Sequence, residues 1–258
     1  MRQVSLITLY GPKPLGLNNL IAEFQSRLSA ILDIKFRPYD VQQIHGTIVG
    51  LERTGKSNLN FAKFRNHFDH MDFDGVLTSL KTEVVPLQIQ LGGFTNQDYP
   101  FTSRGKRPYE RSFVIQNENV VLIGWPIRGQ PLVVPSKEPI GLGEESRSYP
   151  NSLDNLRRSL QRYNILHSYH REPGDVDNDY YFRIGVIDSS SVDQHVVEEL
   201  ETSLRAYLGS WPPLIVEISQ RDLYFASYED SSLPLTSTSV WPVRSNDLTG
   251  NFIWTLFD

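Results

Sequence analysis

His45 and Thr47 have the types and the spacing of residues that handle phosphate groups. They lie in Gln42–Leu51 (QQIHGTIVGL), where apolar and polar residues alternate as they do in a half-buried strand. Residues two apart on a strand project from the same face, so an imidazole would lie beside a hydroxyl. The hydroxyl can donate to a phosphoryl oxygen, and an imidazole that titrates near neutrality can give or take a proton. The same pair also occurs on ordinary solvent-facing strands, so it needs support from the rest of the chain.

Composition narrows the chemistry that is open to this chain. Its 258 residues include no cysteine, which excludes a disulfide framework, a thiolate nucleophile, an iron–sulfur cluster and a cysteine-ligated zinc. With 25 Lys and Arg against 30 Asp and Glu, the formal net charge is −5, so strong general binding to nucleic acid is not expected. No apolar stretch has the length of a membrane span, and the N-terminal apolar run is too short for a signal segment. We therefore expect a cytoplasmic protein, with no membrane association and no cofactor.

The periodicity of apolar residues predicts the elements that must position His45 and Thr47. In the first part of the chain we expect strands and helices in alternation: a strand at 4–10, a helix at 18–32, the strand at 42–51, a helix through 61–71 and a strand at 87–91. A similar order recurs later: a helix at 153–163, a strand at 180–187, a helix at 192–208, and strands at 214–219 and 223–228. Ser191 and Gln194 have the spacing of a capping box at the start of the 192–208 helix. The recurrence predicts two similar lobes that face each other across a cleft.

The residues between the two halves are typical of a hairpin between long loops. Gly92–Arg111 and Ile127–Pro150 are rich in Gly, Pro, Ser and charge and show no clear period. Strands at 112–116 and 120–125 are expected to pair through a turn at 117–119.

This organisation indicates a single α+β domain, 1–258, with two lobes. The approximate lobes are 1–91 and 151–258, and the hairpin and long loops occupy 92–150. The oligomeric state is left open.

The chain resembles the two-histidine (2H) phosphoesterase superfamily, which includes 2′,3′-cyclic-nucleotide phosphodiesterases and RNA 2′,5′-ligase-like proteins. The residues that carry the resemblance are His45-Gly46-Thr47-Ile48, the opening strand VSLITLYG and the late segment LYFASYEDSSLPLTSTSVWPV. The resemblance implies a pseudo-symmetric fold in which antiparallel sheets and helices surround a central cleft. It also implies that each lobe contributes an H-x-T/S motif, with the histidines acting as general base and general acid and the hydroxyls holding the phosphate. His45 and Thr47 match the first motif.

The second motif is absent. The corresponding strand, Tyr180–Ile187, has Tyr181 and Arg183 where the resemblance leads us to expect His and Thr. These two side chains should share the cleft face with His45 and Thr47, where they would bind phosphate. Arginine binds phosphate bidentately and tyrosine offers a hydroxyl, but neither exchanges a proton readily at neutral pH.

Other histidines could replace the missing one. His167 and His170, which precede the 180–187 strand, are the candidate substitute acid or base, although a helix C-terminus favours histidine without any catalytic reason. His67 and His70 have a spacing that could chelate a metal, but no third ligand is identifiable, so no metal is expected. His195, in the first turn of a helix, is interpreted as structural.

The sequence leaves two function classes open beside hydrolysis. The first alternative is a catalytically degenerate module that binds a small nucleotide, an RNA end or a protein without turnover. The second is a P-loop nucleotide-binding enzyme, because GLERTGKS at 50–57 fits G-x-x-x-x-G-K-[ST] between a strand and a helix. The polar face of the preceding strand and the expected antiparallel pairing argue against a P-loop.

The loop at 102–112 (TSRGKRPYERS) is a further candidate surface. Its cations lie beside several aromatic residues, a combination that can hold single-stranded nucleic acid by charge and stacking. The alternative is a solvated loop whose aromatic side chains pack beneath it.

Overall fold

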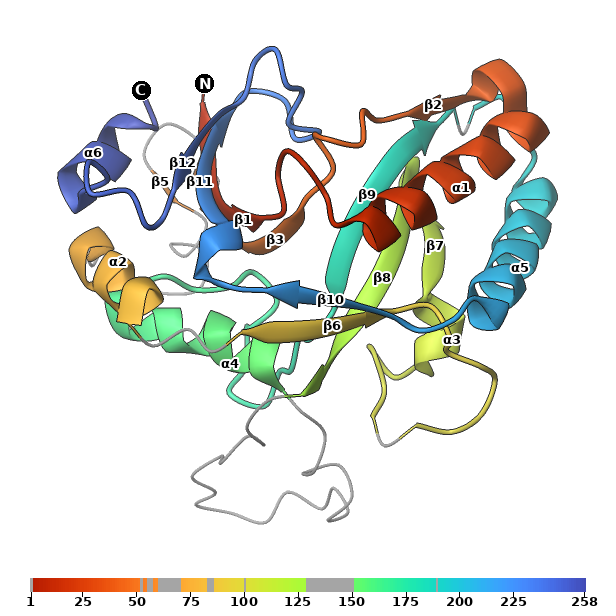
Figure 1. Ribbon diagram of the computed structural model, residues 1–258, viewed down its shortest axis with the longest axis horizontal. Coiled ribbons are helices and arrows are strands. Elements are labelled where there is room, and N and C mark those ends of the chain that lie inside the picture. Colours follow the sequence, from red (N-terminus) through yellow and green to blue (C-terminus); the bar gives the residue numbers. More distant parts are fainter. Residues whose placement is uncertain are drawn as a thin grey trace.

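Two antiparallel sheets form the centre of the protein, and helices lie along them (Figure 1). The computed structural model describes residues 2–51, 53–54, 58–59, 71–82, 86–99, 101–128, 151–188 and 190–258. The first sheet has the order β12-β11-β1-β3. Its strands are β1 (Gln3–Thr8), β3 (Gly46–Gly50), β11 (Leu223–Tyr228) and β12 (Ser239–Pro242). Every pairing in this sheet is antiparallel.

The second sheet has the order β10-β6-β8-β9-β2, with β7 also paired to β8. Its strands are β2 (Phe36–Pro38), β6 (Leu87–Leu91), β7 (Phe113–Gln116), β8 (Asn119–Arg128), β9 (Tyr180–Ile187) and β10 (Leu214–Ile218). The long strand β8 pairs with β7 and β9 through its first residues and with β6 through its last, so the sheet curls along it (Figure 1). A separate short pair consists of β4 (Arg53–Thr54) and β5 (Asn58–Leu59).

The helices cover the sheets with apolar stripes. They are α1 (Leu15–Leu32), α2 (Phe73–Thr82), α3 (Pro108–Arg111), α4 (Ser152–Ser159), α5 (Gln194–Ser210) and α6 (Gly250–Thr255), with 3₁₀ turns at Asp33–Lys35, Leu160–Tyr163 and Gln220–Asp222. Helices α1 and α5 lie beside the second sheet, whereas α2 and α6 pack on each other near the first (Figure 1). No helix in the described parts of the chain is long and apolar enough to cross a membrane.

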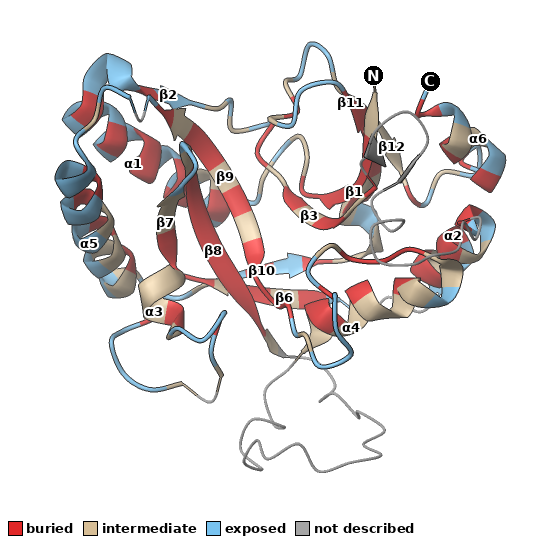
Figure 2. Cartoon of the chain, turned by 180° about the vertical axis from the view of Figure 1, so that it is seen from behind, coloured by how far each residue is buried: buried red, intermediate tan, exposed pale blue. Residues whose placement is uncertain are grey.

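One continuous apolar cluster unites the two sheets and their helices. Strands β8 and β9 are buried along most of their length (Figure 2). A smaller cluster, here called the Trp125 cluster, lies beside it and consists of Phe94, Val121, Ile123 and Trp125, with partly buried side chains around them. Each sheet combines strands from both ends of the chain. Strand β1 is almost wholly buried, and both of its edges find partners, one in β3 and one in β11.

Several elements that the sequence predicts are confirmed. The helix expected at 18–32 is α1, whose buried face includes Leu20, Phe24 and Leu28 at helical spacing. The strand expected at 180–187 is β9. The expected hairpin is β7–β8, and its turn places Asn117 and Glu118 at φ values of 47° and 69°, the left-handed conformation of tight hairpin turns.

Other expectations need correction. The strand expected at 42–51 begins only at Gly46, because Asp40 folds the preceding residues into a turn, accepting hydrogen bonds from the backbone of Gln42 and Gln43. Helix α5 is capped by Asp193, whose side chain accepts from the backbone of His195, and not by Ser191. Ser191 donates instead to the carbonyl of Asp188. Most of the helix expected at 61–71, with His67 and His70, lies outside the described residues.

Candidate functional site

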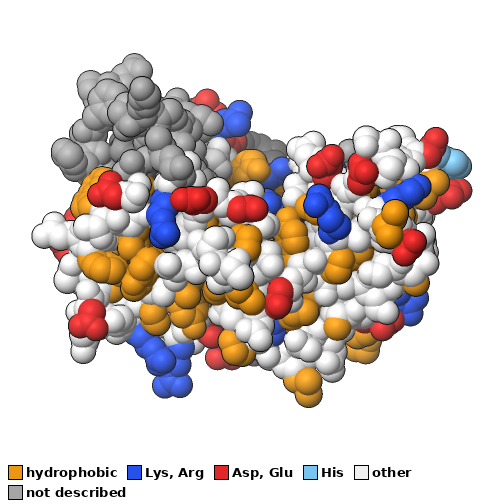
Figure 3. Space-filling model, turned by 90° about the horizontal axis from the view of Figure 1, so that it is seen from above, with side chains coloured by type: hydrophobic (Ala, Val, Ile, Leu, Met, Phe, Trp, Pro, Cys, Tyr) orange, Lys and Arg blue, Asp and Glu red, His pale blue; other side chains and the backbone are white. Residues whose placement is uncertain are grey.

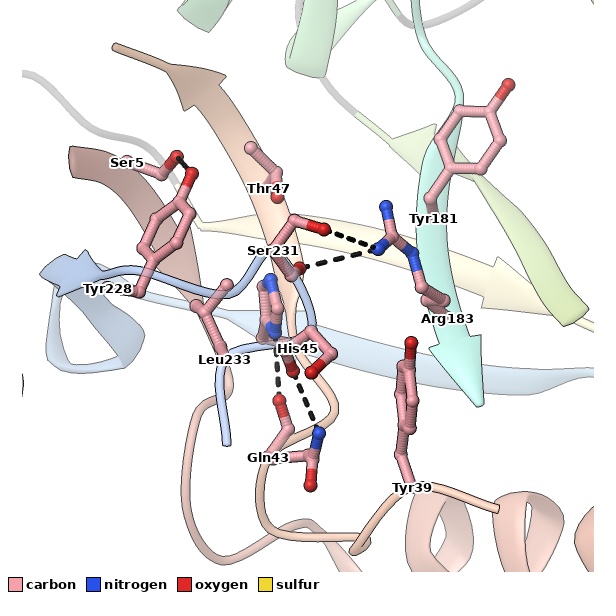
Figure 4. Close-up of a pocket in the computed structure, with 11 residues that line it drawn as sticks. Ser5, Tyr39, Gln43, His45, Thr47, Tyr181, Arg183, Tyr228, Ser231 and Leu233 are labelled. Atoms are coloured by element: carbon pink, nitrogen blue, oxygen red, sulfur yellow. Dashed lines mark hydrogen bonds between the residues drawn. The ribbon is translucent and has the colours of Figure 1, made fainter. Parts of the chain in front are cut away.

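A cavity of about 120 Å³ lies between the two sheets. It is lined by Ser5, Tyr39, Gln43, His45, Thr47, Tyr181, Arg183, Tyr228, Ser231, Ser232 and Leu233. Figure 4 shows that His45 and Thr47 come from the β3 side and Tyr181 and Arg183 from β9. The structure therefore brings the four residues predicted for the cleft face into one pocket, in which hydroxyl groups outnumber charged groups.

The imidazole of His45 is oriented by the backbone. Its Nδ1 lies 2.8 Å from the carbonyl oxygen of Gln43, and a carbonyl oxygen can only accept a hydrogen bond. Nδ1 must therefore carry the hydrogen, which leaves Nε2 of the neutral ring as an acceptor. Figure 4 shows the other ring nitrogen pointing away from Gln43, toward the side of the pocket where Thr47 and Ser231 lie.

The surroundings of His45 favour the neutral ring. Burial lowers the pKa of His45 to about 4, and the positive charges of Arg183 and Lys13 act in the same direction, against the hydrogen bond to Gln43. At neutral pH the side chain is therefore an uncharged proton acceptor. The neutral ring can accept a proton or a hydrogen bond and does not suit a general acid, and its lowered pKa makes it a weak base.

Strand β3, which carries Thr47, is fixed from two directions. The guanidinium of Arg157 donates from Nε to the carbonyl of Ile48 at 2.9 Å and from Nη2 to the carbonyl of Thr47 at 3.0 Å. On the other side, a Cβ atom at Gly46 would lie 2.1 Å from the ring of Tyr180. Only glycine permits this approach of β3 to β9, which explains the residue between His45 and Thr47.

The β9 side of the pocket carries the positive charge of Arg183 and the side chain of Tyr181. Along β9, Tyr180, Phe182 and Ile184 are buried, so Tyr181 and Arg183 project from the opposite face. Nη1 of Arg183 lies 3.4 Å from both the carbonyl and the Oγ of Ser231, across the pocket (Figure 4). Arg183 thus provides the pocket with a cation that a phosphate could engage.

Tyr181 lines the pocket with its ring, and its hydroxyl points away from His45 (Figure 4). That hydroxyl donates to Oδ2 of Asp179 at 3.1 Å and accepts from Nη2 of Arg111 at 2.5 Å. Burial, reinforced by the charge of Asp179, raises the pKa of Tyr181 well above its usual range. A phenol with a raised pKa is a weak acid, so Tyr181 is poorly suited to protonate a leaving group.

His167 and His170 lie in a different environment, which we call the α4 ionic cluster: Asp154, Arg157, Arg158, His167, His170 and Asp177. Nε2 of His167 lies 2.7 Å from Oδ2 of Asp177, and Nε2 of His170 lies 2.7 Å from Oδ1 of Asp154. Both histidines are buried, and neither is among the residues that line the pocket. Burial lowers the pKa of His167 to about 4, helped by the nearby charge of Arg157.

The α4 ionic cluster supports the pocket from behind. Arg157 pairs with Asp177 at 3.2 Å and at the same time holds the carbonyls of Thr47 and Ile48. The cluster therefore ties α4 and the segment before β9 to the strand that carries Thr47.

The sequence also singles out the P-loop pattern, the loop at 102–112 and His195, and these three have different outcomes. The last three residues of the P-loop pattern, Gly55-Lys56-Ser57, lie outside the described residues, and the strand at its start, β3, pairs antiparallel with β1. In the loop at 102–112, Arg107 pairs with Glu110 and Arg111 pairs with Asp179. The neighbouring aromatic side chains pack on the Trp125 cluster. His195, exposed on α5, lies 3.3 Å from Glu199.

Sequence reasoning missed several lining residues. Ser5 is a polar residue inside the apolar run of β1, and its Oγ lies 2.8 Å from the hydroxyl of Tyr228. Ser231 and Ser232 belong to the late segment on which the family resemblance rests, but their own pattern is that of an ordinary turn. A buried serine in an otherwise apolar strand is the signal that could have found Ser5.

Comparisons with known proteins give weak likeness only. No protein-family model and no curated protein matches the chain. Among solved structures, E. coli LigT complexed with phosphate is 13% identical with a TM-score of 0.35, covering 93% of each chain. A structure described as a phosphoesterase is 13% identical with a TM-score of 0.37, covering 96% of this chain and 99% of that one. The protein TT0787 of Thermus thermophilus is 11% identical with a TM-score of 0.35, covering 93% of each. At these values the function has to be argued from the site itself.

Proposed function

We propose that the protein is a 2H phosphoesterase-like hydrolase that binds a phosphodiester in the pocket, as a 2′,3′-cyclic nucleotide or as an RNA end with the same terminal group. The observation that carries the proposal is the bond from His45 Nδ1 to the Gln43 carbonyl, because it leaves Nε2 as a proton acceptor in a pocket that also contains Arg183. Thr47 lines the same pocket, and its hydroxyl can donate to a phosphoryl oxygen.

The reaction that fits these groups is the addition of water to the cyclic phosphate. Arg183 and Thr47 hold the non-bridging oxygens, and Nε2 of His45 takes a proton from the attacking water. The oxygen of that water forms a bond to phosphorus while the bond from phosphorus to one ribose oxygen breaks. The released ribose oxygen takes a proton from solvent, which leaves a phosphomonoester on the other ribose oxygen.

Binding without turnover is the second candidate, and the β9 side of the pocket favours it. The hydroxyl of Tyr181 is engaged by Asp179 and Arg111, and the imidazoles of His167 and His170 are held by carboxylates away from the lining residues. Among the described residues that line the pocket, His45 is the single imidazole. An enzyme without its general acid loses on the order of 10² to 10⁴ in rate, which can reduce turnover to nothing measurable.

The experiment measures both binding and hydrolysis of adenosine 2′,3′-cyclic monophosphate by the wild type and by His45→Ala. We expect wild-type hydrolysis, and a loss of about 10²-fold or more in His45→Ala. His195→Ala is the matched control, because His195 is an exposed histidine on α5, and it should leave the rate unchanged.

The outcomes separate the candidates. Hydrolysis that disappears with His45 supports the hydrolase. Binding by the wild type without hydrolysis supports the binding module. A wild type that neither binds nor hydrolyses the cyclic nucleotide contradicts both, and hydrolysis that is unchanged in His45→Ala contradicts the role of the imidazole.

A further inference from the structure

Positive charge is concentrated around Tyr181, at the edge of the pocket. Arg104, Arg111 and Arg183 all lie near this side chain, whereas Asp179 is the carboxylate that contacts it. The neighbouring Asp177 is paired with Arg157. On the face of the molecule that Figure 3 shows, Lys and Arg side chains are mixed with Asp and Glu side chains. The surroundings of Tyr181 are therefore locally basic in a chain whose net charge is −5.

Arg104 is held there by an unusual backbone. It occupies the tip of a tight turn in which Ser103 and Lys106 exchange backbone hydrogen bonds of 2.8 and 3.0 Å. The turn requires a φ of +49° at Arg104, a left-handed conformation that is unfavourable for a residue with a Cβ. Ser103 fixes the turn by donating to Oδ1 of Asp179 at 2.6 Å. Strained residues that the surrounding structure holds in place are frequent at functional sites.

The guanidinium of Arg104 stacks on aromatic rings. Its Cζ lies 4.3 Å from the centroid of Tyr169 and 5.8 Å from the centroid of Tyr181. Tyr169 is 49% exposed, although it is a large aromatic side chain. The Arg104–Tyr169 stack therefore lies next to Tyr181, which lines the pocket. Tyr169 is open to solvent.

The charge of Arg104 is only partly compensated. Its Nε lies 3.6 Å from Oδ2 of Asp179, and the same oxygen is already bonded to Arg111 at 3.0 Å. The side chain of Arg104 is 34% exposed, against 12% for Arg111. Arg111 thus neutralises the buried carboxylate, and Arg104 is left able to engage an anion from solvent.

We propose that Arg104 and Tyr169 form a subsite for the second nucleotide of an RNA end whose terminal phosphate occupies the pocket. Arg104 contacts the internucleotide phosphate, and Tyr169 stacks on a base. Single-stranded nucleic acid is recognised by this combination of arginine and aromatic groups, and a stacked base contributes about 1–3 kcal/mol. The inference rests on the proposed function and narrows its substrate to an oligoribonucleotide end over a mononucleotide.

The experiment compares two ligands that differ by one nucleotide. The ligands are adenosine 2′-monophosphate and the dinucleotide ApA with the same terminal 2′-phosphate, so that neither contains the cyclic group and turnover does not interfere. Dissociation constants are measured by calorimetry at low and at physiological salt. We expect the dinucleotide to bind on the order of tenfold more tightly, since one stacked base supplies this factor.

One substitution at Arg104 and one at Tyr169 test the two parts of the subsite. Arg104→Asn removes the charge with a residue that tolerates the left-handed backbone, and Tyr169→Ala removes the ring. Either should abolish most of the dinucleotide's advantage and leave the mononucleotide's affinity within about twofold. Arg104→Asn should also reduce the slope of log Kd against log salt by about 0.7 for the dinucleotide, since one phosphate contact is lost. Lys106→Ala, an exposed cation in the same turn, is the control and should change neither ligand.

Each outcome decides the proposal. Equal affinities of the two ligands for the wild type overturn the subsite while leaving the proposed function in place. The same holds if Arg104→Asn weakens both ligands alike, because the residue then acts on the pocket and not on a second nucleotide. If the wild type binds neither ligand, and cyclic nucleotide is also not bound, the proposed function fails and the subsite fails with it.

Discussion

The β3 side and the β9 side of the pocket offer different chemistry. On the β3 side, His45 presents an uncharged acceptor nitrogen, and Thr47 lies two residues away. On the β9 side, Arg183 presents a permanent charge, and the hydroxyl of Tyr181 is bonded to Asp179 and Arg111. One side can therefore move a proton, whereas the other can only hold a charged group. A side chain that lines a pocket therefore does not gain a catalytic role from its position alone.

The largest effect on hydrolysis is expected when the β9 side of the pocket is given the same residue types as the β3 side. The double variant Tyr181→His with Arg183→Thr supplies an imidazole and a hydroxyl on β9, facing those on the β3 side. We expect hydrolysis of adenosine 2′,3′-cyclic monophosphate to rise by about 10²-fold over the wild type, because a second acid–base group would then protonate the leaving oxygen.

The control for that gain is Tyr181→Phe with Arg183→Thr. It removes the same charge without adding an imidazole, so its turnover should not exceed that of the wild type. If the histidine variant gains nothing, although it binds the nucleotide and its folding is intact, the facing arrangement of the two strands does not amount to a catalytic pair.

The sequence predicted the β9 side of the pocket better than the β3 side. Strand β9 and the side on which Tyr181 and Arg183 lie followed from alternation alone, because a half-buried strand sorts its residues by face. His45 reached the pocket although it precedes the strand, since the turn at Asp40 replaces the first residues of the expected strand. That turn depends on a side-chain hydrogen bond which hydrophobic periodicity does not register.

Contacts between distant segments could not be predicted. Ser231 is 48 residues from Arg183 along the chain, and Arg157 is 110 residues from Thr47. Asp179 is the clearest example, because its partners Ser103, Arg111 and Trp125 come from a region whose pattern indicated only loops and a hairpin. Tertiary packing brings these groups together, and no local pattern encodes it.

A smaller effect, on stability and not on turnover, is expected at Gly46, where β3 approaches β9. Gly46→Ala would place a methyl group 2.1 Å from the ring of Tyr180, so β3 or the ring must move. We expect a loss of about 1–3 kcal/mol in the free energy of unfolding, the usual cost of overpacking a core. Thermal unfolding measures it, at roughly 2–4 °C in Tm per kcal/mol for a chain of this size.

Gly174→Ala is the matched control for this contact. A Cβ at Gly174 meets no atom within 4 Å and its φ is not left-handed, so its Tm should stay near that of the wild type. Equal stability of Gly46→Ala and Gly174→Ala would contradict the close approach of β3 to β9.

The most direct test of the role assigned to His45 is the titration of its imidazole by NMR, with the signals assigned by their absence from His45→Ala. The ring is expected to stay neutral, with the hydrogen on Nδ1, until the pH falls to about 4, because burial disfavours the charged form. Inorganic phosphate bound in the pocket should raise this pKa, since a nearby anion favours the imidazolium. A ring that titrates near its ordinary value of 6.5 and does not respond to phosphate would contradict the account.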